Sequence, residues 1–164
     1  MLEAFCDWLQ ATSLSTQIQV ITWIIPAVQI IHILCLAVVL SSVALLDLRL
    51  MGVGARRTSI TGMAAHVLPW IWMAIILMAL TGAVLTIGEP RRELLNPVFQ
   101  TKMILVTAAI LLTFGFQEVL SRNAQFWDRD AGHRLSARLI GAVFLALWFT
   151  IAVCGRLIAY AKTA

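Results

Sequence analysis

Four long apolar stretches alternate with short polar segments along this chain. The stretches cover about residues 20–46, 67–87, 98–120 and 137–160. Each is long enough to cross a bilayer as a helix, because about 20 residues span the hydrocarbon core. The connections are short, so consecutive spans should be antiparallel neighbours. The pattern predicts an all-α polytopic membrane protein, an antiparallel four-transmembrane-helix bundle that forms a single membrane domain over residues 1–164.

A different pattern precedes the first span, in residues 1–14. Apolar residues recur there at helical spacing, opposite polar ones: Leu2, Phe5, Cys6 and Leu9 against Glu3, Asp7 and Gln10. This is typical of a short helix lying in the membrane interface, with Trp8 at headgroup level. We therefore expect a short N-terminal interfacial helix, with a frayed terminus as the alternative.

Composition agrees with a membrane protein. The 164 residues are 61% hydrophobic and 12% charged, and the mean hydropathy is +0.92. The net charge of +4 bears on topology rather than on nucleic acid, for which we expect no binding. The connections after spans 1 and 3 hold more arginine and lysine than the opposite side does: Arg49, Arg56, Arg57, Arg122, Arg129, Arg134 and Arg138, against Arg91, Arg92, Lys102, Arg156 and Lys162. This asymmetry predicts that both termini are periplasmic in a bacterial inner membrane.

Polar side chains inside the first span are the main candidates for chemistry. Gln29, His32 and Cys35 follow one another at a spacing of three, so they share roughly one helix face, which should point into the bundle. We expect His32 about midway across the membrane, level with Met78 to Thr81 of the second span, and neutral. Three interpretations stay open: a polar clasp between helices, a cofactor ligand, or a proton- or substrate-handling group. As a ligand, His32 is a candidate for haem or copper, with Cys35 or Met78 as the second donor.

Charged residues near the span ends are expected to stabilise the structure. Asp47 and Arg49 end the first span, and we expect Asp47 to pair with Arg138, partly hydrated, at the cytoplasmic interface. Glu118 and Arg122 have the spacing of an intrahelical ion pair. At the outer side, Lys102 and Arg156 can extend towards the headgroups, near Glu89 and Glu93. His66 and His133 are expected at the surface.

Several stretches resemble a known family. HILCLAVVLSSVALLDLRLMG, LPWIWMAIILMALTGAVL, NPVFQTKMIL and GRLIAY look like an uncharacterised family of small four-helix bacterial inner-membrane proteins, over nearly the whole chain from His32 on. More remotely, the chain is similar to copper-resistance protein D and to four-helix b-type cytochromes, which implies haem b or copper as a possible cofactor. Members of the family often have a histidine near the end of span 3, where this chain has Gln117.

Motifs of nucleotide-driven pumps and hydrolases are absent from the sequence, which has no Walker loop, HExxH or Gly-x-Ser-x-Gly. We therefore expect no enzyme. Three function classes remain: a structural or accessory membrane protein, a haem- or copper-binding protein of electron transfer or metal handling, and a small transporter or permeation subunit. The expected partners are the lipid bilayer and a second copy of the chain or another membrane protein.

Overall fold

The computed structural model describes residues 1–53, 58–124, 127, 135–158 and 160. Four of its helices are long and apolar enough to cross a membrane. They are α3 (Ile24–Leu50), α4 (Ile60–Gly88), α6 (Pro97–Arg122) and α8 (Leu135–Leu157). Three shorter helices are α1 (Leu2–Gln10), α2 (Ser13–Val20) and α5 (Pro90–Leu94). The predicted all-α membrane architecture is confirmed.

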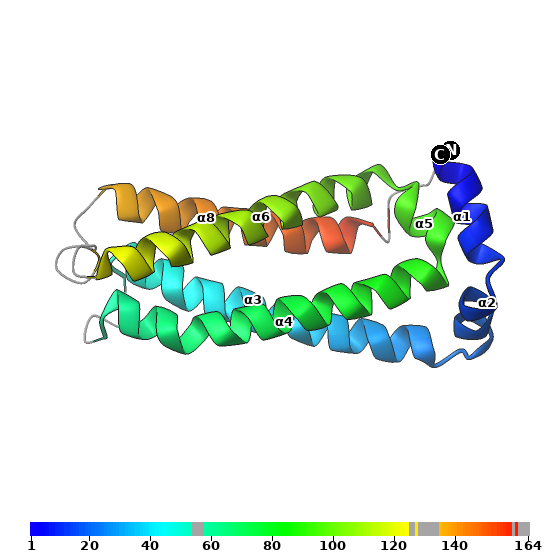
Figure 1. Ribbon diagram of the computed structural model, residues 1–164, viewed down its shortest axis with the longest axis horizontal. Helices are drawn as coiled ribbons and strands as arrows, with labels where there is room; N and C mark the ends of the chain where they lie inside the picture. Colours follow the sequence, from blue (N-terminus) through cyan, green and yellow to red (C-terminus); the bar gives the residue numbers. More distant parts are fainter. Residues whose placement is uncertain (54–57, 125–126, 128–134, 159, 161–164) are drawn as a thin grey trace.

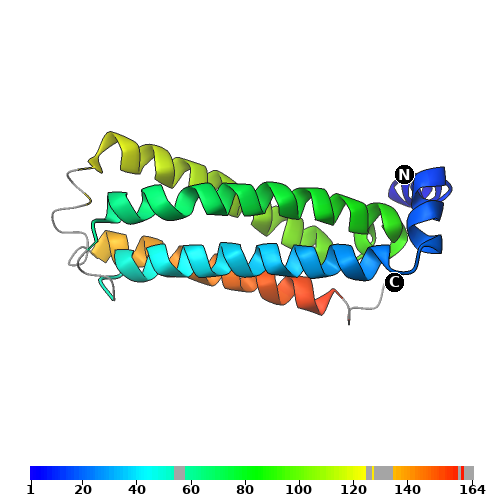
Figure 2. The same cartoon turned by 90° about the horizontal axis from the view of Figure 1, so that it is seen from below.

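The long helices run side by side in alternating directions (Figures 1 and 2). α3 packs against both α4 and α8, and α8 packs against α6. α1, α2 and α5 lie together at one end of the bundle (Figure 1), which we call the terminal end. At the other end, α3 and α6 finish and α4 and α8 begin (Figure 1). We call it the connection end.

The start of the first span differs from the prediction because the chain forms a second short helix before it. α2 ends at Val20, and α3 begins at Ile24 rather than near residue 20. Thr12 caps α2, where its hydroxyl accepts a hydrogen bond from the backbone N–H of Ser15. Pro26 consequently lies in the first turn of α3. A proline there removes no intrahelical hydrogen bond, so α3 can continue through it without a kink.

The second span begins earlier than the hydrophobic pattern suggests. α4 starts at Ile60, after Ser59, whose hydroxyl accepts a hydrogen bond from the Gly62 N–H. A capping serine can begin a helix before the apolar stretch does, because it satisfies a free backbone donor. Pro69, expected in the first turn, therefore lies inside the helix. At the end of the bundle, α8 extends to Leu157 rather than to residue 160.

The core lies along the seams of α3 with α4 and α8. Its largest fully buried side chains include Trp148, Leu50, Ile60 and Ile71. Much of the remaining apolar surface faces outward: in the most apolar window of each long helix, only 11–22% of the residues are buried. Such a large exposed apolar surface is favourable in contact with lipid and unfavourable in contact with water. The protein therefore contacts a bilayer along all four spans.

Candidate functional site

His32 of α3 contacts Thr81 of α4 directly. Its Nδ1 lies 2.8 Å from Thr81 Oγ1, which confirms that His32 is level with the Met78 to Thr81 segment. His32 is half-buried and Thr81 is buried. The histidine stands eight residues after Ile24, about 12 Å along a helix with a rise of 1.5 Å per residue. It therefore lies on the terminal side of the middle of α3, closer to Ile24 than to Leu50.

The hydrogen bonds of Thr81 determine which imidazole nitrogen carries the proton. Thr81 Oγ1 lies 2.8 Å from the carbonyl oxygen of Leu77 and 3.1 Å from that of Met78. Carbonyl oxygens only accept, so the single hydroxyl proton of Thr81 is donated to its own helix. The Nδ1–H of His32 then donates to Thr81 Oγ1. In a neutral ring the lone pair is then on Nε2.

Gly82 lies beside this contact. A Cβ atom at position 82 would lie 3.5 Å from His32 Cε1, an ordinary van der Waals distance. The imidazole thus packs against the backbone of α4 beside the threonine that it bonds. The Thr81-Gly82 pair, one of the features that suggested a family, supplies both the acceptor and the flat surface for the ring.

The other residues expected beside His32 are only partly brought together. Gln29 is exposed and takes part in none of the hydrogen bonds between described residues, so the expected clasp contains His32 without Gln29. The physical reason is that α3 packs closely against α4 only along one seam, and Gln29 lies outside it. Cys35 is a buried free thiol, and Met78 is half-buried on α4. No group of three or more His, Cys, Asp or Glu that could hold a metal occurs among the described residues.

Asp47 has a very different environment from the predicted hydrated ion pair. It is 3% exposed, and none of the ion pairs between described residues includes it. Its Oδ2 atom is buried without a hydrogen-bond partner in the described structure. Arg138 is exposed at the start of α8. The expected Asp47–Arg138 pair is not formed, because the carboxyl group is turned into the core while the arginine stays on the surface.

A close approach of α8 explains how Asp47 becomes buried. A Cβ atom on Gly141 would lie 2.9 Å from the backbone oxygen of Asp47 and 3.3 Å from Leu50 Cβ. Only a glycine allows the two backbones to come so near. Beside Asp47 is a small cavity with a volume of about 10 Å³. Its lining is apolar apart from Asp47 and Thr113: Val43, Leu46, Leu50, Leu68, Ile71, Phe116 and Phe144.

The other described charged residues of the connection end are exposed or half-exposed. Arg49 donates from Nε to the Thr58 carbonyl oxygen at 2.8 Å. The predicted Glu118–Arg122 ion pair is confirmed, with 2.7 Å between Oε1 and Nε. His66 is exposed, as expected. Five arginine and lysine positions used for topology and one histidine lie outside the described residues: Arg56, Arg57, Arg129, Arg134, Lys162 and His133.

Gln117, which stands where the family often has a histidine, links α6 to α4. Its Oε1 accepts a hydrogen bond of 2.8 Å from Trp72 Nε1. The same tryptophan makes an edge contact with Phe114, with 6.4 Å between ring centroids. Gln117 therefore has a structural contact of its own, although sequence reasoning treated it only as a missing ligand.

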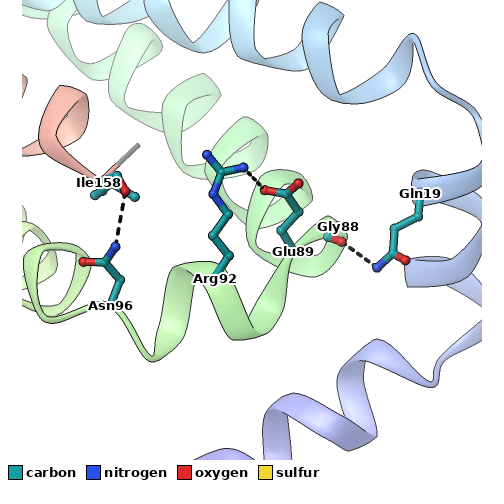
Figure 3. Close-up of polar contacts among 6 residues, drawn as sticks. All are labelled: Gln19, Gly88, Glu89, Arg92, Asn96 and Ile158. Atoms are coloured by element: carbon teal, nitrogen blue, oxygen red, sulfur yellow. Dashed lines mark hydrogen bonds and ion pairs between the residues drawn. The ribbon is translucent and has the colours of Figure 1, made fainter. Parts of the chain in front are cut away.

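A polar network at the terminal end was not foreseen. Figure 3 shows Gln19 of α2 pointing to the carbonyl of Gly88, and Asn96 pointing to that of Ile158. Gln19 Nε2 lies 2.8 Å from the Gly88 carbonyl oxygen, and Asn96 Nδ2 lies 3.3 Å from the Ile158 carbonyl oxygen. Asn96 also caps α6, since its Oδ1 accepts from the Val98 N–H. An asparagine followed by proline is a recognisable helix start, but its second bond to the end of α8 depends on tertiary packing.

Charged groups of α5 complete the terminal end. Arg91 bonds to Asp7 of α1, and this hydrogen bond raises the pKa of Arg91 above its ordinary value. Partial burial raises the pKa of Glu93, while the nearby Lys102 ammonium acts in the opposite direction. Lys102 itself lies against α8, where its Nζ is 3.7 Å from the position of a Cβ on Gly155. Arg156 stacks over the Tyr160 ring at 5.4 Å from its centroid.

The architecture and the buried polar groups define a multi-pass membrane protein with a four-helix bundle. A family model matches residues 5–161 of the chain. The protein belongs to that family, a family of unknown function designated DUF6644. No curated protein and no solved structure matches the chain. The resemblance to small four-helix membrane proteins of unknown function is thus confirmed.

Proposed function

We propose that this protein is a non-catalytic accessory protein of the bacterial inner membrane, in which His32 holds the first two spans in register. The observation that carries the proposal is the hydrogen bond from His32 Nδ1 to Thr81 Oγ1. It gives a polar atom of an apolar span a partner on the neighbouring helix. The ring packs beside Gly82 at an ordinary contact distance. The role of His32 is then to specify helix pairing.

The experiment is an absorption spectrum and metal analysis of the detergent-purified protein, grown with ample haem and copper. We expect neither a Soret band nor stoichiometric copper. We also expect His32→Gln to leave expression and the thermal midpoint nearly unchanged, because glutamine can also donate to Thr81. His66→Gln, at an exposed histidine, is the matched control. A stoichiometric cofactor that His32→Gln removes, while the apoprotein still inserts, would overturn the proposal.

A cofactor-binding role is the second candidate, and one observation favours it. Because Thr81 occupies Nδ1, the ring is oriented and Nε2 keeps its lone pair, as in histidines that bind metals. The rest of the donor set does not fit. Cys35 and Met78 are the nearest candidates from the sequence, and the described residues contain no cluster of three or more metal-binding His, Cys, Asp or Glu groups. For a haem with two histidine ligands, Gln117 replaces one candidate and is bonded to Trp72.

A transporter role rests on a polar line through Gln29, His32 and Cys35. Gln29 is exposed and shares no bond with His32, so the line is interrupted at its first residue. Flux of protons or ions through proteoliposomes of the pure protein would establish this alternative and exclude a purely structural role.

Orientation in the membrane is part of the proposal: both termini are periplasmic. The support is the excess of arginine in the two connections at the other side. Alkaline phosphatase becomes active only outside the cytoplasm, so fusions at the C-terminus should be active and fusions near Arg57 inactive. The reverse pattern would show that the bundle is inserted the other way.

A further inference from the structure

Asp47 combines three properties that a structural carboxylate does not usually have together. It is 3% exposed, its Oδ2 has no partner in the described structure, and it borders a cavity between all four spans. An ionised carboxylate is costly to bury unless a positive charge or several hydrogen-bond donors accompany it. The proposed structural role of His32 does not involve this group, which lies 15 residues further along α3.

Among the residues that the structure describes, the charges around the cavity do not supply a counter-ion. Arg49, two residues along α3, uses its Nε on the Thr58 carbonyl. On α6, Arg122 is paired with Glu118. Arg138 of α8 is exposed and forms no ion pair with Asp47, and His66 of α4 is exposed. None of the residues lining the cavity other than Asp47 is titratable.

The size and lining of the cavity restrict what can neutralise the carboxylate. The cavity volume of about 10 Å³ is enough for about one water molecule. Ca²⁺ and Mg²⁺ are held by about six to eight oxygen ligands, whereas only Asp47 and Thr113 have side-chain oxygens in the lining. A proton needs no further oxygen ligands, because one O–H bond on the carboxyl group removes the charge.

We propose that Asp47 is a proton-binding site in the core of the bundle, completed by one water molecule in the adjoining cavity. The carboxylate takes a proton from water at the connection end, and a neutral carboxylic acid results. Its O–H donates to the cavity water. That water donates in turn to Thr113 Oγ1, whose own proton is donated to the Ala109 carbonyl at 2.7 Å. Asp47 lies three residues before the end of α3, about 4.5 Å along the axis, so the path for the proton is short.

Infrared spectroscopy of the full-length protein in detergent at neutral pH tests the site. A protonated carboxylic acid has a carbonyl band separate from the amide and carboxylate bands. We expect this band in the wild type, a shift on labelling with ¹³C-aspartate, and its complete loss in Asp47→Asn. Glu93→Gln is the matched control, because Glu93 is the other carboxyl group with an environment that favours the acid. The band that shifts on aspartate labelling should survive that change.

Thr113→Val tests the water separately. Without the hydroxyl, the acid band should persist but shift to the frequency of a more weakly hydrogen-bonded carboxyl. An unshifted band would show that the water is not part of the site. The proposal is overturned if no aspartate-derived acid band exists at neutral pH, or if the band remains in Asp47→Asn. It is also overturned if Na⁺, compared with choline, raises the thermal midpoint of the wild type and not of Asp47→Asn, because a metal cation would then be the occupant.

Discussion

His32 and Asp47 are both polar residues of α3 within the bundle, and they differ in their hydrogen-bond partners. His32 is half-buried and has a partner on the neighbouring helix, whereas Asp47 is buried and its Oδ2 has none among the described residues. The difference follows from what each meets across the interface. α4 presents Thr81, with an oxygen that can accept. α8 presents Gly141, which offers backbone proximity and no side chain.

This contrast shows that small residues have two distinct effects at helix contacts. Beside His32, Gly82 leaves the imidazole at an ordinary contact distance from α4, where it bonds to Thr81. Beside Asp47, Gly141 brings two backbones so close that the carboxyl group is shielded from bulk water. Close packing thus stabilises a polar contact in one place and isolates a polar group in the other.

The largest effect is expected from breaking the close approach at Asp47. Gly141→Ala places a Cβ atom 2.9 Å from the Asp47 carbonyl oxygen, so the helices must separate. Overpacking of this kind costs about 1–3 kcal/mol. The matched control is Gly115→Ala, because a Cβ atom on Gly115 meets nothing within 4 Å. Thermal unfolding in detergent should show a clear loss only for Gly141→Ala; equal midpoints would mean that the helices at Asp47 are not closely packed.

A smaller effect is expected from removing the partner of His32. Thr81→Val leaves Nδ1–H without its acceptor, and interhelical hydrogen bonds in membranes contribute about 0.6 kcal/mol on average and up to about 1.7. Thr107→Val is the control, because the Thr107 hydroxyl bonds only to the Met103 carbonyl of its own helix. The difference between the two unfolding free energies measures the contact. If the two variants lose the same stability, the bond to His32 contributes nothing measurable.

The smallest effect concerns Glu93, a partly buried carboxyl group at the terminal end that extends the comparison. Burial raises the pKa of Glu93 in the folded protein. A raised folded pKa favours folding at low pH, and this contribution is lost as pH rises through the folded pKa. Lowering the pH from neutral should therefore stabilise the wild type relative to Glu93→Gln. Thermal midpoints across this range check it, with the exposed Glu118→Gln as control; parallel curves for wild type and Glu93→Gln would contradict it.

The length of the apolar stretches was enough to predict the four spans, and helical spacing was enough for the Glu118–Arg122 pair. The level of His32 with Thr81 also followed from counting residues along antiparallel helices. Helix starts were less accurate, since capping by Thr12 and Ser59 extends helices into polar sequence. Those capping residues are visible in the sequence, although the hydrophobic pattern conceals them.

Partners across helices could not be predicted, because they depend on helix rotation and separation. The expected bond between Asp47 and Arg138 assumed that opposite charges near one membrane face would meet. The structure instead turns Asp47 inward, since Gly141 allows α8 to cover it. Gln29 shows the same limit: it has the helical spacing to accompany His32, but the α3–α4 seam does not include it. The bond from Asn96 to Ile158 joins residues 62 positions apart, beyond any local pattern.

The position of α1 has a consequence for how the protein is made. Cys6 and Asp7 contact Pro90 and Arg91, each pair separated by 84 residues. Ribosomes add about 5–20 residues per second, so these partners emerge on the order of 4–17 s after α1 at that rate. Throughout that interval α3 and α4 are synthesised while α1 lacks its partners on α5. The contacts between α1 and α5 can thus form only after the first two spans exist, and they mark the completion of that helical hairpin.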